Sequence, residues 1–231
     1  MAITHDDLKV LAQWDTPTIC NALEITNPER RGWGFSIEPF AVLDPDLPPI
    51  VGYARTAKIR ASTPDLSDGA KGMEARFPYY EYVESQDAPA VLLIEDVDPH
   101  PGIGAFWGEV HTAVHKGLGI SGCVTNGSFR DITDSAPGFQ ILGGMVNPSH
   151  AFVHYIDFNC EVTVHGMTAS HGDIIHADQH GAVVVPEEAV KKIPDAVATI
   201  SAKEKLILDA ARRDDFSVEK LKAAISGGDI H

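Results

Sequence analysis

The pattern of apolar positions along the chain predicts helices at both ends. Apolar residues recur at helical spacing over residues 6–25, and Asp15-Thr16-Pro17 interrupts them. Asp or Thr can cap a helix and Pro suits its first turn, so a second helix is expected to begin there. A long amphipathic helix is expected from Glu187 to about Arg212, because Pro186-Glu187-Glu188 is a typical helix start. A shorter helix is expected over Val218–Ile225.

Short apolar runs between these helices predict strands. Ala90–Ile94 (AVLLI) is continuously apolar, which is typical of a strand buried on both faces. Ile120–Val124 is a partly β-branched run that ends just before Asn126-Gly127, a pair that turns the chain. Further strands are expected at Gly52–Ile59, Phe139–Val146, Glu161–His165, Asp173–His176 and Ala182–Val185, with a loop over 27–50 and mixed helix and loop over Asp65–Glu84.

These elements predict an α/β fold, in which terminal helices flank a central mixed sheet. No repeat, low-complexity segment or linker divides the sequence. The expectation is therefore a single domain over residues 1–231.

The amino-acid composition argues against several classes of function. The 231 residues include 18 Lys and Arg against 33 Asp and Glu, a formal charge of −15. This excess argues against nucleic-acid binding and against anionic membrane surfaces, although one local arginine can still hold a small anionic substrate. No stretch has the pattern of a signal peptide or the roughly 20 apolar residues of a membrane span. A cytoplasmic protein is therefore expected.

The cysteines do not form a recognisable disulfide or redox pattern. They are odd in number, far apart and in apolar surroundings, which favours buried free thiols. A nucleophilic role remains an alternative for one of them, Cys123. The other two are Cys20 and Cys160.

Two residues with functional chemistry follow the strand predicted at Ile120–Val124. Arg130 is a planar cation that can hold a carboxylate through two hydrogen bonds, and Asp131 can hold a hard divalent metal ion. Functional groups collect on loops where a strand ends, which favours a role for both residues. The alternative is a solvated pair in a turn.

A second candidate is the segment Gly108–His111 (GEVH), where a helix is expected to begin near Trp107 or Gly108. The first N–H groups of a helix have no partner within it and favour a carboxylate or phosphate. Glycine would let such a ligand approach the backbone. The alternative is an ordinary helix start in which Glu109 has a capping role.

Histidine spacing suggests a different function, a zinc hydrolase. Histidines four apart face one side of a helix and can bind zinc. Only one of the three such pairs lies on a predicted helix, and that pair lacks the Glu of the HExxH signature. The pairs are His111/His115, His150/His154 and His176/His180.

The combined motifs resemble the RraA-like family, specifically its class II pyruvate aldolases of the 4-hydroxy-4-methyl-2-oxoglutarate aldolase type. The resemblance rests on Gly108–His111, on Arg130-Asp131, and on GDII at 172–175 followed by DQHGAVVVP at 178–186. The wider group includes RraA, the regulator of ribonuclease E activity. This chain departs from the usual pattern at Asn21, at His171 and at His111, which is unusual at the end of its tetrad.

The resemblance implies a divalent-metal-dependent lyase. In such enzymes the tetrad, here Gly108, Glu109, Val110 and His111, gives backbone N–H groups to the pyruvate unit. Arg130 would bind the pyruvate oxygens, and Asp131 would hold Mg²⁺ or Mn²⁺. The implied reaction cleaves a 4-hydroxy-2-oxo acid into pyruvate and an oxo compound through a metal-stabilised pyruvate enolate. Oxaloacetate decarboxylation is implied as a side activity.

The resemblance also implies the fold and the assembly. The expected structure is a layered α/β domain with a swivelling β/β/α core, assembled as homotrimers or homohexamers with sites between subunits. Glu109, or Glu204 from a neighbouring subunit, would assist a water molecule as the base; a solvated surface acid is the alternative for Glu204. The competing function is a non-catalytic RraA-like regulator that binds a protein partner. Asp131 favours the enzyme, because the regulators lack a competent metal site.

Overall fold

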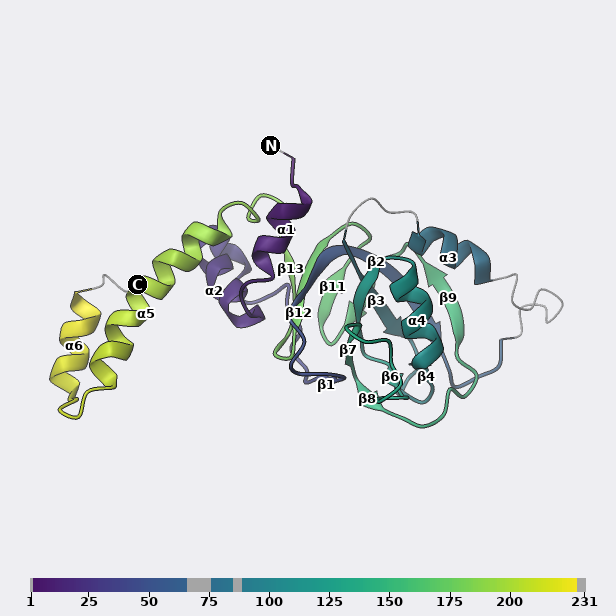
Figure 1. Ribbon diagram of the computed structural model, residues 1–231. Helices are drawn as coiled ribbons and strands as arrows, with labels where there is room; N and C mark the ends of the chain where they lie inside the picture. The colour runs from purple at the N-terminus through teal and green to yellow at the C-terminus, as the bar shows by residue number, and fades with distance from the viewer. Residues whose placement is uncertain (1, 66–75, 85–88, 228–231) are drawn as a thin grey trace.

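A computed structural model describes residues 2–65, 76–84 and 89–227, and an eight-stranded mixed sheet forms its centre (Figure 1). The strand order is β1-β7-β5-β3-β2-β12-β13, and β9 also pairs with β2. The central strands β2, β3, β5 and β7 are parallel, whereas the outer pairs are antiparallel. The strands are β1 (Ala41–Val42), β2 (Ile50–Arg60), β3 (Ala90–Asp96), β5 (Ile120–Thr125), β7 (Gln140–Gly143), β9 (His154–Phe158), β12 (Ile174–Asp178) and β13 (Gly181–Val185).

A small parallel sheet continues three of the central strands. After a break, β3 is followed by β4, β5 by β6, and β7 by β8. At Gly144 a Cβ atom would lie 2.3 Å from a backbone carbonyl oxygen, so only glycine fits the break between β7 and β8. The single strand predicted over Phe139–Val146 is therefore two strands in different sheets. The bounds are β4 (Ala105–Trp107), β6 (Ser128–Phe129) and β8 (Met145–Val146).

Both faces of the main sheet are covered. Helices α3 (Phe77–Glu84) and α4 (Glu109–Gly117) lie on one face, and a hairpin of β10 (Val162–Val164) and β11 (Met167–Ala169) lies on the other. Strand β3 is buried on both faces, as its sequence predicts. Its alternate side chains enter two different clusters, Leu92 and Ile94 in one, Val91 and Leu93 in the other.

The N-terminal helices pack beside β12 and β13. Helix α1 (His5–Leu11), helix α2 (Thr16–Thr26) and the first part of the long C-terminal helix share one apolar cluster with these strands. Helix α2 begins as predicted, because the Asp15 carboxylate accepts the Thr18 N–H at 2.9 Å and a proline lies in the first turn. A short 3₁₀ turn, η1 (Pro28–Arg30), follows it.

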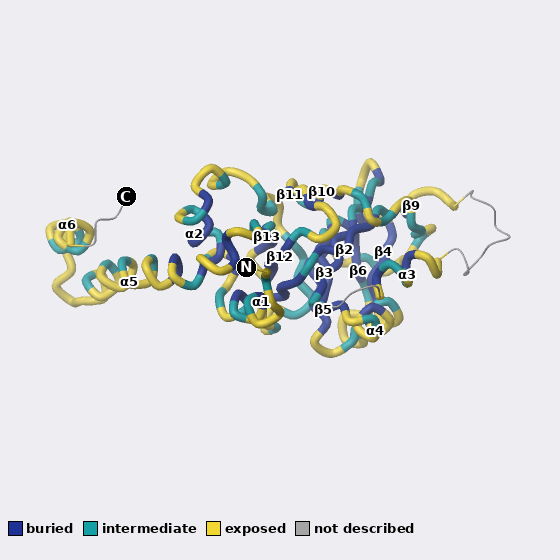
Figure 2. Tube along the Cα trace, turned by 90° about the horizontal axis from the view of Figure 1, so that it is seen from above, coloured by how far each residue is buried: buried dark blue, intermediate teal, exposed yellow. Residues whose placement is uncertain are grey.

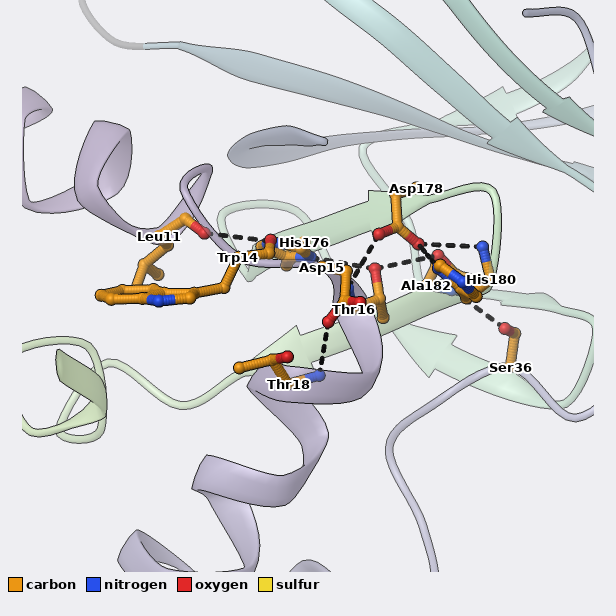
Figure 3. A network of polar contacts seen from close by, with 11 residues as sticks. Leu11, Trp14, Asp15, Thr16, Thr18, Ser36, His176, Asp178, His180 and Ala182 are labelled. Atoms are coloured by element: carbon orange, nitrogen blue, oxygen red, sulfur yellow. Dashed lines mark hydrogen bonds and ion pairs between the residues drawn. The ribbon is translucent and has the colours of Figure 1, made fainter. Parts of the chain in front are cut away.

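A buried polar network ties these helices to the hairpin of β12 and β13 (Figure 3). The Thr16 N–H donates to Asp178 at 2.9 Å, and the Thr16 hydroxyl lies 3.0 Å from Nδ1 of His176. Nε2 of His176 lies 3.2 Å and 3.0 Å from the carbonyl oxygens of Leu11 and Trp14. Carbonyl oxygens only accept, so Nε2 carries the proton and Nδ1 accepts from the hydroxyl. Burial lowers the pKa of His176, which keeps the ring neutral.

The C-terminal helix α5 (Ile193–Ala211) begins later than predicted. Residues 187–192 form successive turns, with the Lys192 N–H donating to the carbonyl of Ala189 at 2.8 Å. Pro194 has no N–H to continue a helix begun at Glu187, but it suits the first turn of a new one.

Helices α5 and α6 (Val218–Ser226) project from the body of the molecule (Figure 1). Much of the second half of α5 and of α6 is exposed (Figure 2). Within the described ranges no helix is both long and apolar enough to cross a membrane. The predicted mixed α/β architecture with helices at both chain ends is confirmed.

Candidate functional site

The ends of β4 and β6 bring the two sequence motifs together. Strand β4 leads directly into Gly108 and helix α4, and β6 leads directly into Arg130 and Asp131. The Arg130 N–H donates to the carbonyl oxygen of Trp107 at 3.0 Å, which joins the two segments through their backbones. Two motifs 22 residues apart in the sequence therefore form one site.

The start of α4 is not capped by the side chain of its own N-cap residue. Gly108 occupies the N-cap position with extended backbone, and no side chain caps the helix from there. Instead the Glu109 N–H donates to Oδ2 of Asp131 at 3.2 Å. The capping role considered for Glu109 is absent at this helix start. Both Glu109 and Val110 are exposed.

Asp131 is held in position by its own backbone. Its φ of 54° is in the left-handed region, which Asp tolerates better than most residues. The Asp131 carbonyl accepts the N–H groups of Asp134 and Ser135 at 3.1 Å and 2.9 Å, and the Ser135 hydroxyl at 2.9 Å. Oδ2 of Asp131 also lies 3.6 Å from Nε of Arg130. A helix N–H and a guanidinium therefore converge on one carboxylate oxygen, which is the arrangement needed to hold an anion.

Asp131 also has the donor chemistry of an Mg²⁺ or Mn²⁺ ligand. Mg²⁺ is usually held by one or two carboxylates together with water and substrate oxygens, not by a cage of protein groups. The Asp131 side chain is 37% exposed, so it can reach such an ion beside a bound substrate. Among the described residues no three His, Cys, Asp or Glu side chains are grouped to hold a metal ion. A single carboxylate at an open surface fits a magnesium-type ion better than zinc.

Hydrogen bonds fix both rings of the histidine pair on α4. Nδ1 of His111 is bonded to the carbonyl oxygen of Phe106, and Nδ1 of His115 donates to the carbonyl of His111 at 2.7 Å. Nε2 of His115 lies 2.9 Å from the Tyr79 hydroxyl. Burial lowers the pKa of His115 to about 3, so this ring is a neutral structural group. The other two pairs lie on loops and strands, without the helical geometry of a zinc pair: His150/His154 and His176/His180.

Two other groups with potential chemistry are structural. The network of Figure 3 contains a hydroxyl, an imidazole and a carboxylate, but Thr16, His176 and Asp178 are 4%, 0% and 5% exposed. The Nε2–H of its histidine is already donated to backbone carbonyls. Cys123 is fully buried, and burial raises the pKa of its thiol well above the usual value. Neither group can reach a substrate.

Within one chain, Glu204 does not join this site. It is an exposed residue of α5, and this helix projects away from the sheet, whereas β4, β6 and α4 lie in the sheet region (Figures 1 and 2). Gly108 follows β4, and Arg130 follows β6. The aromatic packing behind α4 had no sequence signal. There the His115 ring lies 4.8 Å from Trp107, and the His111 ring lies 4.3 Å from Phe106.

Gly108→Ala is expected to lower activity, because a Cβ atom at this position would lie 2.5 Å from Oδ2 of Asp131 and displace it. The extended backbone suits alanine. The free energy of unfolding should therefore fall by no more than about 1 kcal/mol, the usual cost of a weaker N-cap. Gly117→Ala, in the last turn of the same helix, is the matched control, since a Cβ there meets nothing within 4 Å. Initial rates and thermal unfolding of both variants test this; equal activity in both would contradict the crowding argument.

Comparison with known proteins identifies the family of this chain. A family model described as "RraA-like: Aldolase/RraA" matches residues 16–184, which include Gly108, Arg130 and Asp131. Protein DlpA of Legionella pneumophila is 28% identical over 128 residues. That match covers 53% of this chain but 18% of DlpA, so the chain spans less than a fifth of that relative.

Solved structures share the fold. An uncharacterised protein from Pseudomonas syringae pv. tomato is similar with a TM-score of 0.70 and 20% identity, over 98% of this chain and 96% of that one. RraAS2 of Streptomyces coelicolor, described as an unusual member of the RNase ES inhibitor RraA protein family, is similar with a TM-score of 0.67 and 21% identity, over 92% of this chain and 99% of that one. At these identities the likeness concerns the fold. Because the family model matches more than half of the chain, this protein belongs to the RraA-like (Aldolase/RraA) family.

Proposed function

We propose that this protein is a class II pyruvate aldolase, a lyase that cleaves a 4-hydroxy-2-oxo acid into pyruvate and an oxo compound with the aid of Mg²⁺ or Mn²⁺. The observation that carries the proposal is the convergence of the Glu109 N–H and the Arg130 guanidinium on one carboxylate oxygen. With Asp131 in place, the other N–H groups of this helix start and of the Arg130 guanidinium would hold the carboxylate of a 2-oxo acid beside it. Oxaloacetate decarboxylation is part of the proposal, because that reaction also forms the pyruvate enolate.

The chemistry requires positive groups where negative charge develops. Breaking the bond between C3 and C4 leaves its electrons on the pyruvate unit as an enolate. Gly108, Glu109, Val110 and His111 supply backbone N–H groups at the start of α4, where the helix dipole favours anions. The planar fork of Arg130 would bind two oxygens of the pyruvate unit. These groups stabilise the enolate more than the uncharged 2-oxo group of the substrate.

Asp131 would hold the divalent ion, which when bound supplies a further positive charge beside the 2-oxo oxygen. Two carboxylates are proposed around the reacting end of the substrate. Glu109 comes from the same chain, and Glu204 comes from a neighbouring subunit. Each would orient a water molecule or accept the proton that leaves the 4-hydroxyl group.

A screen for pyruvate release tests the proposed function. Oxaloacetate and a panel of 4-hydroxy-2-oxo acids would be supplied with Mg²⁺, with Mn²⁺ and with excess chelator, and pyruvate would be measured with a coupled dehydrogenase. The expected result is release from at least one acid that depends on the metal ion. No release from any of them would favour the alternative, an RraA-like regulator that binds a protein partner.

The same proposal includes an assembly, a homotrimer or homohexamer with the site at the subunit seam. Apolar side chains on the projecting helices support it, because Leu206 and Leu208 are 45% and 43% exposed and would gain from cover by another subunit. Closed symmetric assemblies are the usual way to bury such surfaces. In a trimer Glu204 of one subunit would lie near Arg130 of the next.

Mixing two inactive variants is expected to restore part of the activity if the site is shared. Arg130→Ala and Glu204→Gln subunits would be unfolded together, refolded and assayed. Some seams in mixed oligomers then combine an intact arginine from one subunit with an intact glutamate from another. Demonstrably mixed oligomers without any recovery, or a fully active monomer in solution scattering, would rule out the shared site.

A further inference from the structure

His111 and His115 differ in the hydrogen bonding of Nε2. Nδ1 of His111 faces the carbonyl oxygen of Phe106, which can only accept a hydrogen bond, so Nδ1 carries the proton. In the neutral ring Nε2 therefore has a free lone pair. No described residue forms a hydrogen bond with Nε2 of His111, whereas Nε2 of His115 is bonded to the Tyr79 hydroxyl.

The position of the ring is fixed by the elements behind it. The His111 carbonyl accepts the Nδ1–H of His115 at 2.7 Å, and His115 is itself fully buried. The imidazole rests against the Phe106 ring at 4.3 Å between centroids. His111 belongs to the first turn of α4, directly after Gly108, Glu109 and Val110, and it is only partly buried. Its ring is close enough to Arg130 for the charge of that guanidinium to lower the pKa of His111.

The surroundings of His111 favour the neutral form of its ring. Burial lowers the pKa of His111, and the nearby positive charges of Arg76 and Arg130 lower it further. A neutral imidazole beside an arginine that holds the substrate is suited to accept a proton from the substrate.

We propose that His111 is the catalytic residue that moves the proton during carbon–carbon cleavage, from the 4-hydroxyl group to C3. This inference rests on the proposed function and leaves to Glu109 and Glu204 the orientation of water. Nε2 forms a bond to the hydroxyl proton, and the electrons of that O–H bond form the new C4 carbonyl. The C3–C4 bond breaks and its electrons form the enolate. The imidazolium then returns the proton to C3, which gives the methyl group of pyruvate and restores the lone pair.

The three reactions expected at the site depend differently on a group that accepts a proton. Oxaloacetate has no 4-hydroxyl proton to remove, because its leaving group is carbon dioxide from a carboxylate that is already ionised, and the enolate that remains takes its C3 proton from water. Cleavage of a 4-hydroxy-2-oxo acid needs the proton acceptor, and so does exchange of the pyruvate methyl protons with solvent. Loss of His111 should therefore separate the reactions, while loss of Arg130 should lower all of them.

The test compares His111→Asn with the wild-type protein and with His5→Asn, a change at an exposed histidine on α1. Asparagine can still donate a hydrogen bond to the Phe106 carbonyl but has no basic nitrogen. Cleavage of a 4-hydroxy-2-oxo acid and deuterium exchange into the pyruvate methyl group, followed by NMR in D₂O, are each expected to fall at least about 100-fold in His111→Asn. Oxaloacetate decarboxylation should fall less than about tenfold, with KM nearly unchanged and His5→Asn normal.

The outcomes separate failure of the role of His111 from failure of the proposed function. Normal cleavage and exchange in His111→Asn, or an equal fall in all three reactions, would overturn the role of His111 and leave the proposed function intact. His111→Gln, compared by circular dichroism and thermal unfolding, provides a second variant if asparagine unfolds the helix start. The wild-type protein provides a test without any variant, because cleavage without methyl exchange would also overturn the role of His111. A wild-type protein inactive in every assay would overturn the proposed function and this inference with it.

Discussion

Arg130→Lys is expected to lower kcat/KM for pyruvate release by at least about 100-fold, the usual effect of removing a group that stabilises a developing oxyanion. Lysine keeps the positive charge but lacks the planar fork that binds two oxygens at once. The Arg130 side chain is 38% exposed and makes one long contact to Asp131, so stability should change little. The measurement is the initial rate of pyruvate formation with saturating Mg²⁺.

The control for Arg130→Lys is Arg31→Lys. Arg31 is an exposed arginine that pairs with Glu24 at 2.8 Å, on a loop far along the chain from α4. This variant should keep the wild-type rate and melting temperature. If Arg130→Lys also keeps a near-normal rate, Arg130 acts as a simple charge or as a structural residue, and recognition by its planar fork is wrong.

Asp131→Asn is expected to abolish the activity that depends on the divalent metal. Asparagine has almost the same shape, tolerates the left-handed backbone at φ 54° and can still accept the Glu109 N–H. It lacks the negative charge that holds a hard divalent ion. Loss of the metal contribution to a developing charge costs about 3 kcal/mol or more, which is roughly a 100-fold fall in rate.

Asp131→Asn is paired with Asp134→Asn, a change at an exposed carboxylate three residues later in the same loop. Rates would be measured across a range of Mg²⁺ and Mn²⁺ concentrations, with circular dichroism to confirm that both variants fold. Asp134→Asn should behave as wild type. Full activity in Asp131→Asn, or wild-type activity in excess chelator, would show that Asp131 holds no catalytic metal.

The parts of the fold that were predicted correctly have strong local signals. Asp15 and Pro17 mark the start of α2 because a cap and a fixed φ act within one turn. The apolar run of β3 predicts a strand buried on both faces for an equally local reason. By contrast, β6 and β8 are two residues long and exist only through pairing with other strands, so no periodicity can reveal them.

Some features of the candidate site also have a local sequence signal, and others depend on packing between distant segments. Gly108 could be identified because a helix begins there, and Arg130 because it follows β5 and the turn at Asn126-Gly127. The bond of 3.0 Å between the Arg130 N–H and the Trp107 carbonyl depends on the packing of two strands and had no sequence signal. The proton positions on His111 and His115 also depend on which carbonyl each ring meets. The histidine spacing raised a zinc site only as a minor alternative, and among the described residues no three His, Cys, Asp or Glu side chains are grouped to hold a metal ion.

The most direct test of the central claim is binding of oxalate, a planar dianion with the shape and charge of the pyruvate enolate. Titration calorimetry would compare wild type, Arg130→Lys and Asp131→Asn with and without Mg²⁺. Wild type is expected to bind oxalate at least about tenfold more tightly with the metal ion, a difference of roughly 1.4 kcal/mol. Arg130→Lys should weaken binding, and Asp131→Asn should remove its dependence on the metal ion. Equal binding by all three proteins, or no binding by wild type with Mg²⁺, would contradict the assignment of this site to a 2-oxo acid and a divalent metal.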